Sequence, residues 1–189
     1  MSATMPLARH KLSVEDYHRM GEAGIFTPDS RVELIEGEVI DMAPIGSPHA
    51  SIVSLLTMFF AREVGHAGIV FTQNPIRLPP DSEPQPDLAI LKPRADHYRK
   101  SLPLASDVLL LIEVSDTTAA LDRQVKVPLY ARHGIPEVWL VDLQAERLEV
   151  YSAPQGRSYG GLRRLGRQDS VTPGLFQVPA LRLEEIWPA

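Results

Sequence analysis

Residues 108–114 read VLLLIEV, and this stretch decides the fold. The aliphatic run Val108 to Ile112 predicts a strand that is covered on both faces and lies deep in a sheet. Glu113 stands at the end of that strand. A buried carboxylate costs on the order of several kcal/mol unless it is paired or binds a metal. We therefore expect Glu113 to have a partner.

A second carboxylate has the same character. Asp87 follows Pro86 and opens the apolar run Leu88–Leu91. If the two strands are neighbours, the two carboxylates can converge, and like charges held close favour a cation between them. The chain has no cysteine, so an oxygen-rich site favours Mg²⁺ or Mn²⁺. The spacing leaves an alternative open, in which each carboxylate caps a helix or bonds an arginine.

The flanking segments predict a mixed α/β (α+β) fold, with a central mixed sheet flanked by helices and additional β-hairpins. A length of 189 residues suits a single domain over residues 1–189. Helices are expected from Ser13 to Met20, from Ser47-Pro48 to about Gly65, and from Thr118 to His133, with Ser13 and Ser47 as N-caps and Gly134 ending the last helix. Strands are expected near Ile69–Leu78 and at Asp87–Leu91, and hairpins at Arg31–Met42, turning at Glu36-Gly37, and at Val138–Asp142 with Leu148–Ser152.

Composition favours a soluble, cytoplasmic protein. Hydrophobic residues make up 44% and charged residues 23% of the chain. Met1 to Leu12 contain no long apolar segment of a secretory signal, and no apolar run approaches the ~18 residues of a membrane span. A net charge of −5 argues mildly against a general nucleic-acid binder, but a local basic patch can still hold phosphates. Two patches are candidates, with solvated surface charge as the alternative for each: Lys92, Arg94, Arg99 and Lys100, and Arg157, Arg163, Arg164 and Arg167.

Six motifs, in this order and spacing, resemble the PD-(D/E)XK nuclease superfamily and, more narrowly, the Uma2 family of endonucleases, formerly a domain of unknown function. They are RVELIEG (31–37), Pro48-His49 before a helix, QPDLAIL (85–91), IEVS (112–115), DRQVKVPLY (122–130) and GIPEVWLVD (134–142). The resemblance covers nearly the whole chain. It implies a restriction-endonuclease-like core in a single PD-(D/E)XK nuclease-like domain. It also implies hydrolysis of DNA phosphodiester bonds with Mg²⁺ or Mn²⁺, and a homodimer as in many nucleases of this superfamily.

The resemblance also assigns the site. It implies Asp87 and Glu113 as metal ligands together with the carbonyl of Val114, and Glu33 as a further acidic residue beside them. The alternative for Glu33 is a pair with Arg31. His49 falls near the positive end of the second predicted helix, which suits contact with phosphate, or else serves local structure.

One departure from the superfamily pattern concerns its lysine, because Ser115 stands two residues after Glu113. The Uma2 resemblance implies that Lys126 replaces it from the following helix. Asp122, Lys126 and Tyr130 follow one another at four-residue steps and so share one helical stripe, with an adjacent stripe that can face the sheet: Leu121, Val125 and Leu129. The alternative for Lys126 is a surface ion pair with Asp122. Pro128 predicts a kink beside Lys126.

Two residues of the GIPEVWLVD motif are expected to be architectural. Trp139 is predicted to pack in the core, and Glu137 to pair with a basic residue. Two other functions remain open: a catalytically silent nuclease fold that binds nucleic acid or protein, and a metal phosphodiesterase acting on a small substrate.

Overall fold

The computed structural model describes residues 9–27 and 29–187. The predicted absence of a secretory signal over Met1–Leu12 falls mostly outside these residues. The chain divides into two compact units: Met1–Ala43 with Arg77–Pro84, and Pro44–Ile76 with Gln85–Ala189. The single domain over residues 1–189 stays a prediction.

The first unit holds a capped helix and a hairpin. α1 (Val14–Glu22) begins with a capping box, in which Ser13 Oγ accepts from the Asp16 N–H and Asp16 Oδ2 accepts from the Ser13 N–H, both at 3.0 Å. β1 (Val32–Ile35) and β2 (Glu38–Asp41) pair antiparallel. Between them Glu36 and Gly37 have φ angles of +47° and +77°, as a tight hairpin turn requires. The predicted N-cap and hairpin are confirmed.

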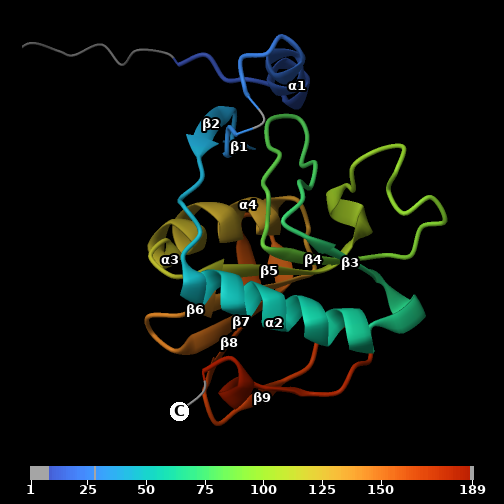
Figure 1. The fold of residues 1–189 in the computed structure, drawn as a ribbon, viewed down its shortest axis with the longest axis vertical. Coiled ribbons are helices and arrows are strands. Elements are labelled where there is room, and N and C mark those ends of the chain that lie inside the picture. Colours follow the sequence, from blue (N-terminus) through green and yellow to red (C-terminus); the bar gives the residue numbers. More distant parts are fainter. Residues whose placement is uncertain (1–8, 28, 188–189) are drawn as a thin grey trace, which may run out of the picture. The chain divides into compact units, whose positions relative to one another are not determined.

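The second unit is built on a six-stranded mixed sheet (Figure 1). Its order is β3-β4-β5-β6-β7-β8, and every neighbouring pair is antiparallel except β5 with β6, which is parallel. The strands are β3 (Ile69–Thr72), β4 (Leu88–Leu91), β5 (Val108–Ser115), β6 (Glu137–Asp142), β7 (Arg147–Gln155) and β8 (Ser158–Gly166). A separate pair is β9 (Ser170–Val171) with β10 (Leu181–Arg182), and 3-10 turns are η1 (Gly65–Ala67), η2 (Ala105–Asp107) and η4 (Leu183–Glu185). The mixed α/β fold class is confirmed.

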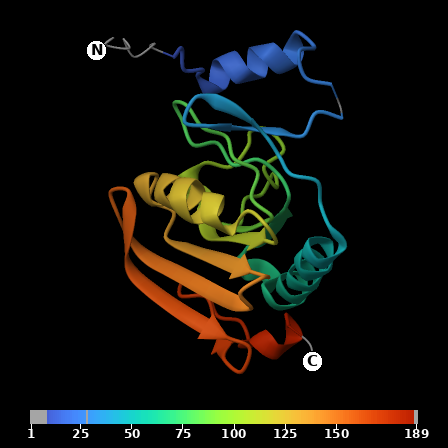
Figure 2. The same ribbon diagram turned by 90° about the vertical axis from the view of Figure 1, so that its left-hand side faces the viewer.

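Helices cover both faces of this sheet (Figure 2). α2 (Ser47–Glu63) packs on one face, where Leu56 and Phe60 meet Ile112 and Trp139 in the main hydrophobic core. The other face is covered by α3 (Ala119–Leu121), the π-helix η3 (Asp122–Lys126) and α4 (Val127–Arg132). Because side chains alternate along a strand, Ile112 points toward α2 and its neighbour Glu113 points toward η3 and α4. The buried β5 and the core position of Trp139 are as predicted.

Three boundaries differ from the predictions. The N-cap of α2 is Gly46, which has no side chain to bond, and Ser47 is the first helical residue. β3 ends at Thr72, because Gln73 adopts a left-handed backbone with φ of +48°. The predicted helix from Thr118 is three successive segments, with a π-helix in the middle.

The π-helix explains how the chain accommodates Pro128. Proline has no N–H to bond the carbonyl of Gln124, so an ordinary α-helical turn cannot close there. Instead the Val127 N–H bonds the carbonyl of Asp122, five residues back. The predicted disturbance beside Lys126 is therefore a widened turn directly before Pro128.

Candidate active site

Asp87 directly precedes β4, and its carboxylate contacts β5 at Val114, the residue after Glu113. The antiparallel register places Leu88 opposite Ile112, so continuing it by one residue would place Asp87 opposite Glu113. Directly opposed residues of an antiparallel pair project their side chains to the same face.

Asp87 is held by three groups of the second unit. Its Oδ2 accepts a hydrogen bond from the Val114 N–H at 2.9 Å. Its Oδ1 lies 3.0 Å from His49 Nε2 and 3.4 Å from Gln73 Nε2. His49 is the third residue of α2, and Asp87 directly precedes β4. Their contact therefore joins the beginning of β4 to the beginning of that helix.

Glu113 is 4% exposed and faces the π-helix. Its Oε1 accepts a hydrogen bond of 2.5 Å from Tyr130 Oη and lies 3.4 Å from Lys126 Nζ. The expectation that Glu113 needs a partner is confirmed. Lys126 next to Glu113 offsets the charge of that carboxylate, so repulsion alone does not require a metal between Asp87 and Glu113.

Lys126 reaches Glu113 because its helical stripe faces the sheet. Asp122, Lys126 and Tyr130 are all buried, whereas Leu121 is 47% exposed. The prediction that the Leu121 stripe faces the sheet is thus wrong at that residue, because the π-helical turn changes which positions face inward. The alternative of a surface ion pair between Lys126 and Asp122 is also wrong, because both side chains are buried.

Ser115, which stands in the place of the superfamily lysine, binds the start of the π-helix. Asp122 Oδ2 accepts hydrogen bonds from Ser115 Oγ at 2.5 Å and from Thr118 Oγ1 at 2.9 Å. The end of β5 is therefore tied directly to the segment that carries Lys126.

A buried ionic cluster beside this segment was not predicted from the sequence. Arg123 Nη2 bonds Asp142 Oδ2 at 2.5 Å, and Arg123 Nε bonds Glu149 Oε2 at 2.9 Å. Tyr151 Oη also donates to Glu149 Oε2, at 2.6 Å. Asp142 at the end of the VWLVD run, and Glu149 between the buried Leu148 and Val150, are the sequence signals that could have revealed buried carboxylates.

The charges of this cluster are stabilised by one another. The hydrogen bond to Asp142 is the main cause of the raised pKa of Arg123, despite partial burial. Burial opposes ionisation of Asp142 and Glu149. Hydrogen bonds from Arg123 to both carboxylates, and from Tyr151 to Glu149, outweigh burial and hold each carboxyl pKa below its ordinary value.

A row of directly paired residues on neighbouring strands runs across the sheet from Glu113 to Glu149 of the Arg123 cluster. Glu113 on β5 is level with Leu140 on β6, Leu140 with Glu149 on β7, and Glu149 with Arg164 on β8. Neighbouring strands lie about 4.8 Å apart, so the backbones of Glu113 and Glu149 are roughly 10 Å apart on the same face.

Glu33 belongs to the first unit, where it is buried in β1 opposite Ile40. Burial first, and then the charges of Glu83 and Glu33, raise the pKa of Tyr17. Arg31, the alternative partner, donates to the carbonyl of Ala43 at 3.3 Å. The place of Glu33 beside the metal ligands stays a prediction.

The oxygen atoms near the end of β5 are of the chemical kinds that divalent cations bind. The N–H and C=O of one strand residue point to the same side, so the Val114 carbonyl points toward β4, as its N–H does. The Ser115 carbonyl points the other way and accepts from the Leu143 N–H at 2.9 Å. Two carboxylates and one carbonyl are ligands that Mg²⁺ and Mn²⁺ accept. Within residues 9–27 and 29–187, no group of three or more His, Asp or Glu side chains is placed to hold a metal.

The two basic patches lie differently with respect to this site. Lys92 follows β4 at the end opposite to Asp87, so the first patch is about one strand length, roughly 13 Å, away. There Arg94 bonds Asp96 at 2.7 Å and stacks 3.7 Å over the Tyr98 ring. In the second patch Arg164 lies in the row of Glu113, with Nε 3.5 Å from Glu149.

Glu137 accepts hydrogen bonds from Trp139 Nε1 and from the Gly174 N–H, so the prediction of a basic partner for Glu137 is wrong.

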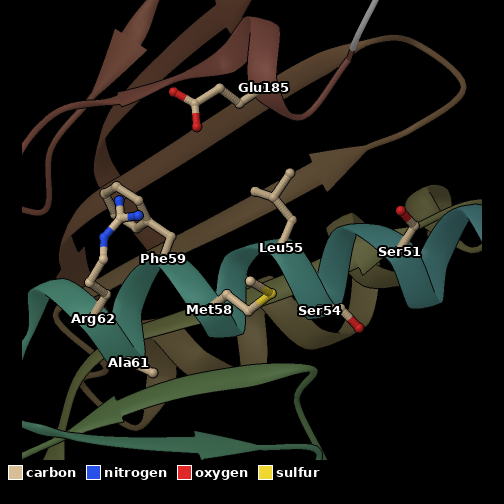
Figure 3. Close-up of a pocket in the computed structure, with 8 residues that line it drawn as sticks. All are labelled: Ser51, Ser54, Leu55, Met58, Phe59, Ala61, Arg62 and Glu185. Carbon is tan, nitrogen blue, oxygen red and sulfur yellow. The ribbon is translucent and has the colours of Figure 1, made fainter.

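A hollow of about 850 Å³ lies along the outer face of α2 (Figure 3). It is mainly apolar: Leu55, Met58 and Phe59 line it, together with the charged Arg62 of the same helix and Glu185 of η4. Met58 is 73% exposed. None of the lining residues belongs to the carboxylate site.

The six-stranded mixed sheet between helices defines a nuclease-like α/β fold. The chain belongs to the Uma2 family, whose profile, described as "Putative restriction endonuclease", matches residues 14–183. A solved structure, titled a "putative nuclease belonging to DUF820" from Anabaena variabilis, superposes with a TM-score of 0.67. Its sequence is 16% identical, and the match covers 93% of this chain and 97% of that one. The search of curated proteins gives no match.

Family membership supports a nuclease, a hydrolase of phosphodiester bonds. Among the helices of the described residues, none has the length and apolar character needed to cross a membrane.

Proposed function

We propose that this chain is a Mg²⁺- or Mn²⁺-dependent endonuclease that hydrolyses phosphodiester bonds in DNA. The observation that carries the proposal is the hydrogen bond from the Val114 N–H, directly after Glu113, to Asp87 Oδ2, together with Lys126 Nζ 3.4 Å from Glu113 Oε1. It is supported by membership in the Uma2 family, whose profile is described as "Putative restriction endonuclease".

Asp87, Glu113 and the Val114 carbonyl would hold the ion. When bound, the divalent ion supplies a Lewis acid to a phosphodiester oxygen and lowers the pKa of bound water. The Val114 N–H keeps Asp87 turned toward β5, and Tyr130 keeps Glu113 turned toward the same end of the sheet. The protein thus orients both carboxylates through groups on rigid elements.

Lys126 contributes a buried positive charge next to the carboxylates. In its proposed role the ammonium orients the attacking water or stabilises negative charge that develops on the phosphate. A low-dielectric surrounding strengthens that interaction, and Lys126 is 8% exposed. It therefore takes the role that the superfamily gives to a lysine at position 115.

His49 is proposed to contact the phosphate while it orients Asp87. It lies in the first turn of α2, where unpaired backbone N–H groups favour an anion. Its Nε2 also lies 3.0 Å from Asp87 Oδ1. Glu33 is proposed as the further acidic residue of the site.

Cutting both strands of a duplex with one site per chain calls for two copies, so the proposal includes a homodimer. Sedimentation of the full chain at increasing concentration tests this point. Sedimentation as a monomer at every concentration at which it cuts both strands would contradict it.

A second candidate is a catalytically silent nuclease fold that binds nucleic acid. It is favoured by the protein partners of both carboxylates, because Asp87 has His49 and the Val114 N–H, and Glu113 has Lys126 and Tyr130. Such a network satisfies buried carboxylates without a metal.

A nicking assay on supercoiled plasmid separates the candidates. Wild type, Asp87→Ala and a control, Glu137→Gln, are incubated with Mg²⁺, with Mn²⁺ and with a chelator. The control alters the buried carboxylate of Glu137, the first residue of β6, which bonds Trp139 and is not part of the proposed site. We expect metal-dependent nicking by wild type and by the control, and none by Asp87→Ala.

Other outcomes identify another function. Binding of DNA without nicking by wild type supports the silent module. Cleavage of a small phosphodiester or of RNA, with plasmid left intact, overturns the DNA assignment. Nicking by Asp87→Ala at the wild-type rate rejects this site.

A further inference from the structure

We propose that Arg123 is a positioning residue, which fixes the π-helix on β6 and β7 and thereby sets the place of the Lys126 ammonium beside Glu113. This inference rests on the proposed function, because that function gives Lys126 the role of orienting the attacking water or stabilising charge on the phosphate.

Two cations of one short π-helix each contact a glutamate in the same row of the sheet. Lys126 Nζ lies 3.4 Å from Glu113 on β5, and Arg123 Nε bonds Glu149 on β7 at 2.9 Å. Leu140 on β6 separates the two glutamates in the row. The π-helix therefore spans three strands, held at one side by Arg123 and carrying Lys126 at the other.

The backbone alone does not fix this turn well. Pro128 cannot donate a hydrogen bond to Gln124, and the turn closes through the wider bond from Val127 to Asp122. π-helical turns are rare, and they are frequently found at functional sites. Contacts with the sheet must therefore hold the segment in register, and the contacts of Asp122 and Arg123 do so.

Arginine suits the anchor because its head meets two carboxylates on different strands. Nη2 bonds Asp142 at the end of β6, and Nε bonds Glu149 on β7. A planar guanidinium with donors in fixed directions holds both partners at once, whereas an ammonium is a point charge. Asp142 in turn is level with Ser115, whose hydroxyl bonds Asp122. Consecutive residues of the π-helix are thus tied to the ends of β5, β6 and β7.

The test measures the accessibility of Lys126 directly, on the full chain. Acetylation rates of individual lysines are followed by mass spectrometry in wild type, Arg123→Met, Arg123→Lys and Tyr151→Phe. Arg123→Met keeps the apolar stem and removes the head. Tyr151→Phe is the matched control, because it also removes a hydrogen bond to Glu149 but leaves the π-helix untouched. Exposed Lys11, Lys92 and Lys100 report the activity of the reagent in each sample.

We expect the Lys126 rate to rise about tenfold or more in Arg123→Met and to stay near the wild-type rate in Tyr151→Phe. Arg123→Lys should recover part of the protection, because an ammonium can still pair with one carboxylate. In plasmid cleavage, kcat should fall about tenfold in Arg123→Met while KM changes by less than about threefold, and Arg123→Lys should recover part of kcat. Urea unfolding gives the folded fraction of each variant, because a general loss of structure lowers the concentration of active enzyme and so lowers the apparent kcat without changing KM.

If Arg123→Met does not fold, the neutral triple variant Arg123→Met/Asp142→Asn/Glu149→Gln removes the three charges together, so neither position 142 nor position 149 holds a buried carboxylate that has lost its cation. The same rise in Lys126 reactivity is then expected. A Lys126 rate within about twofold of wild type in a folded variant without the Arg123 head overturns the inference. Failure of wild type to cut DNA, with Lys126 still deprotected by loss of Arg123, rejects the proposed function and leaves the positioning role standing.

Discussion

Lys126 Nζ in the π-helix lies 3.4 Å from Glu113 Oε1 on β5, and both side chains are buried. Buried pairs of this kind have an asymmetric energetic effect. Removing one partner leaves a charge without its counterion, whereas removing both charges together is close to neutral. Stability and catalysis at this pair can therefore be separated by mutation.

The first prediction uses this asymmetry. Lys126→Met should abolish cleavage and lower the free energy of unfolding by about 3 kcal/mol, because Glu113 loses its cation and keeps Tyr130. The double variant Lys126→Met/Glu113→Gln should recover most of the stability and none of the cleavage. Urea unfolding and plasmid nicking measure the two effects. Cleavage by Lys126→Met at the wild-type rate would remove Lys126 from the catalytic site.

The second prediction concerns the metal. Mg²⁺ and Mn²⁺ should raise the melting temperature of wild type, because a ligand that binds the folded state stabilises it, by about 2.7 kcal/mol at a hundredfold excess over Kd. Asp87→Asn and Glu113→Gln should each lose this shift.

Glu137→Gln is the control for the metal effect, since its carboxylate bonds Trp139 and the Gly174 N–H at the other end of β6. It should keep the full shift. If Asp87→Asn and Glu113→Gln also keep it, the ion binds elsewhere on the chain.

Local sequence signals predicted the elements of the fold well. The capping pair Ser13 and Asp16, the turn at Glu36-Gly37 and the apolar run of β5 each depend on neighbours in the chain. They are visible in the sequence for that reason. Asp87 and Glu113 could each be singled out in the same way, because each residue adjoins an apolar strand whose burial makes a carboxylate costly, and their joint metal site stays a prediction.

Features that depend on register were not predicted. Four-residue spacing predicted that Asp122, Lys126 and Tyr130 share a stripe, but it did not predict the π-helix, which accompanies the burial of this stripe and the exposure of Leu121. The contacts of Arg123 with Asp142 and Glu149 join segments that become neighbours only in the folded sheet. The contact of His49 with Asp87 likewise needs α2 to lie beside the end of β4.

The third prediction concerns Ser115. Returning the lysine to the superfamily position, in Ser115→Lys with Lys126→Ala, should not restore cleavage. Ser115 is fully buried and its hydroxyl bonds Asp122, so a lysine there has no room and would displace the start of the π-helix.

Ser115→Ala is the milder test of the same contact. It should lower the free energy of unfolding by about 1 kcal/mol, because Asp122 keeps its bond from Thr118. Recovery of cleavage by the lysine swap would show that position 115 can still reach the phosphate.

The last prediction concerns acid. The pKa values of Asp142 and Glu149 lie below their ordinary values of 3.8 and 4.5, because hydrogen bonds from Arg123 and Tyr151 outweigh the effect of burial. A carboxyl whose folded pKa is lowered binds fewer protons when folded than when unfolded. Its stabilising contribution is therefore complete above about pH 5 and is lost as the pH falls through the lowered folded values.

The free energy of unfolding of wild type, measured in urea at successive pH values, should accordingly fall below about pH 5. In Arg123→Met the cation that holds both pKa values down is absent. The protein should then be less stable at neutral pH and should lose less of that stability on acidification, so the two curves converge in acid. Parallel curves would mean that Arg123 does not set the ionisation of these two carboxylates. The ionic anchor proposed for the π-helix would then have to be abandoned, whatever the cleavage assay shows.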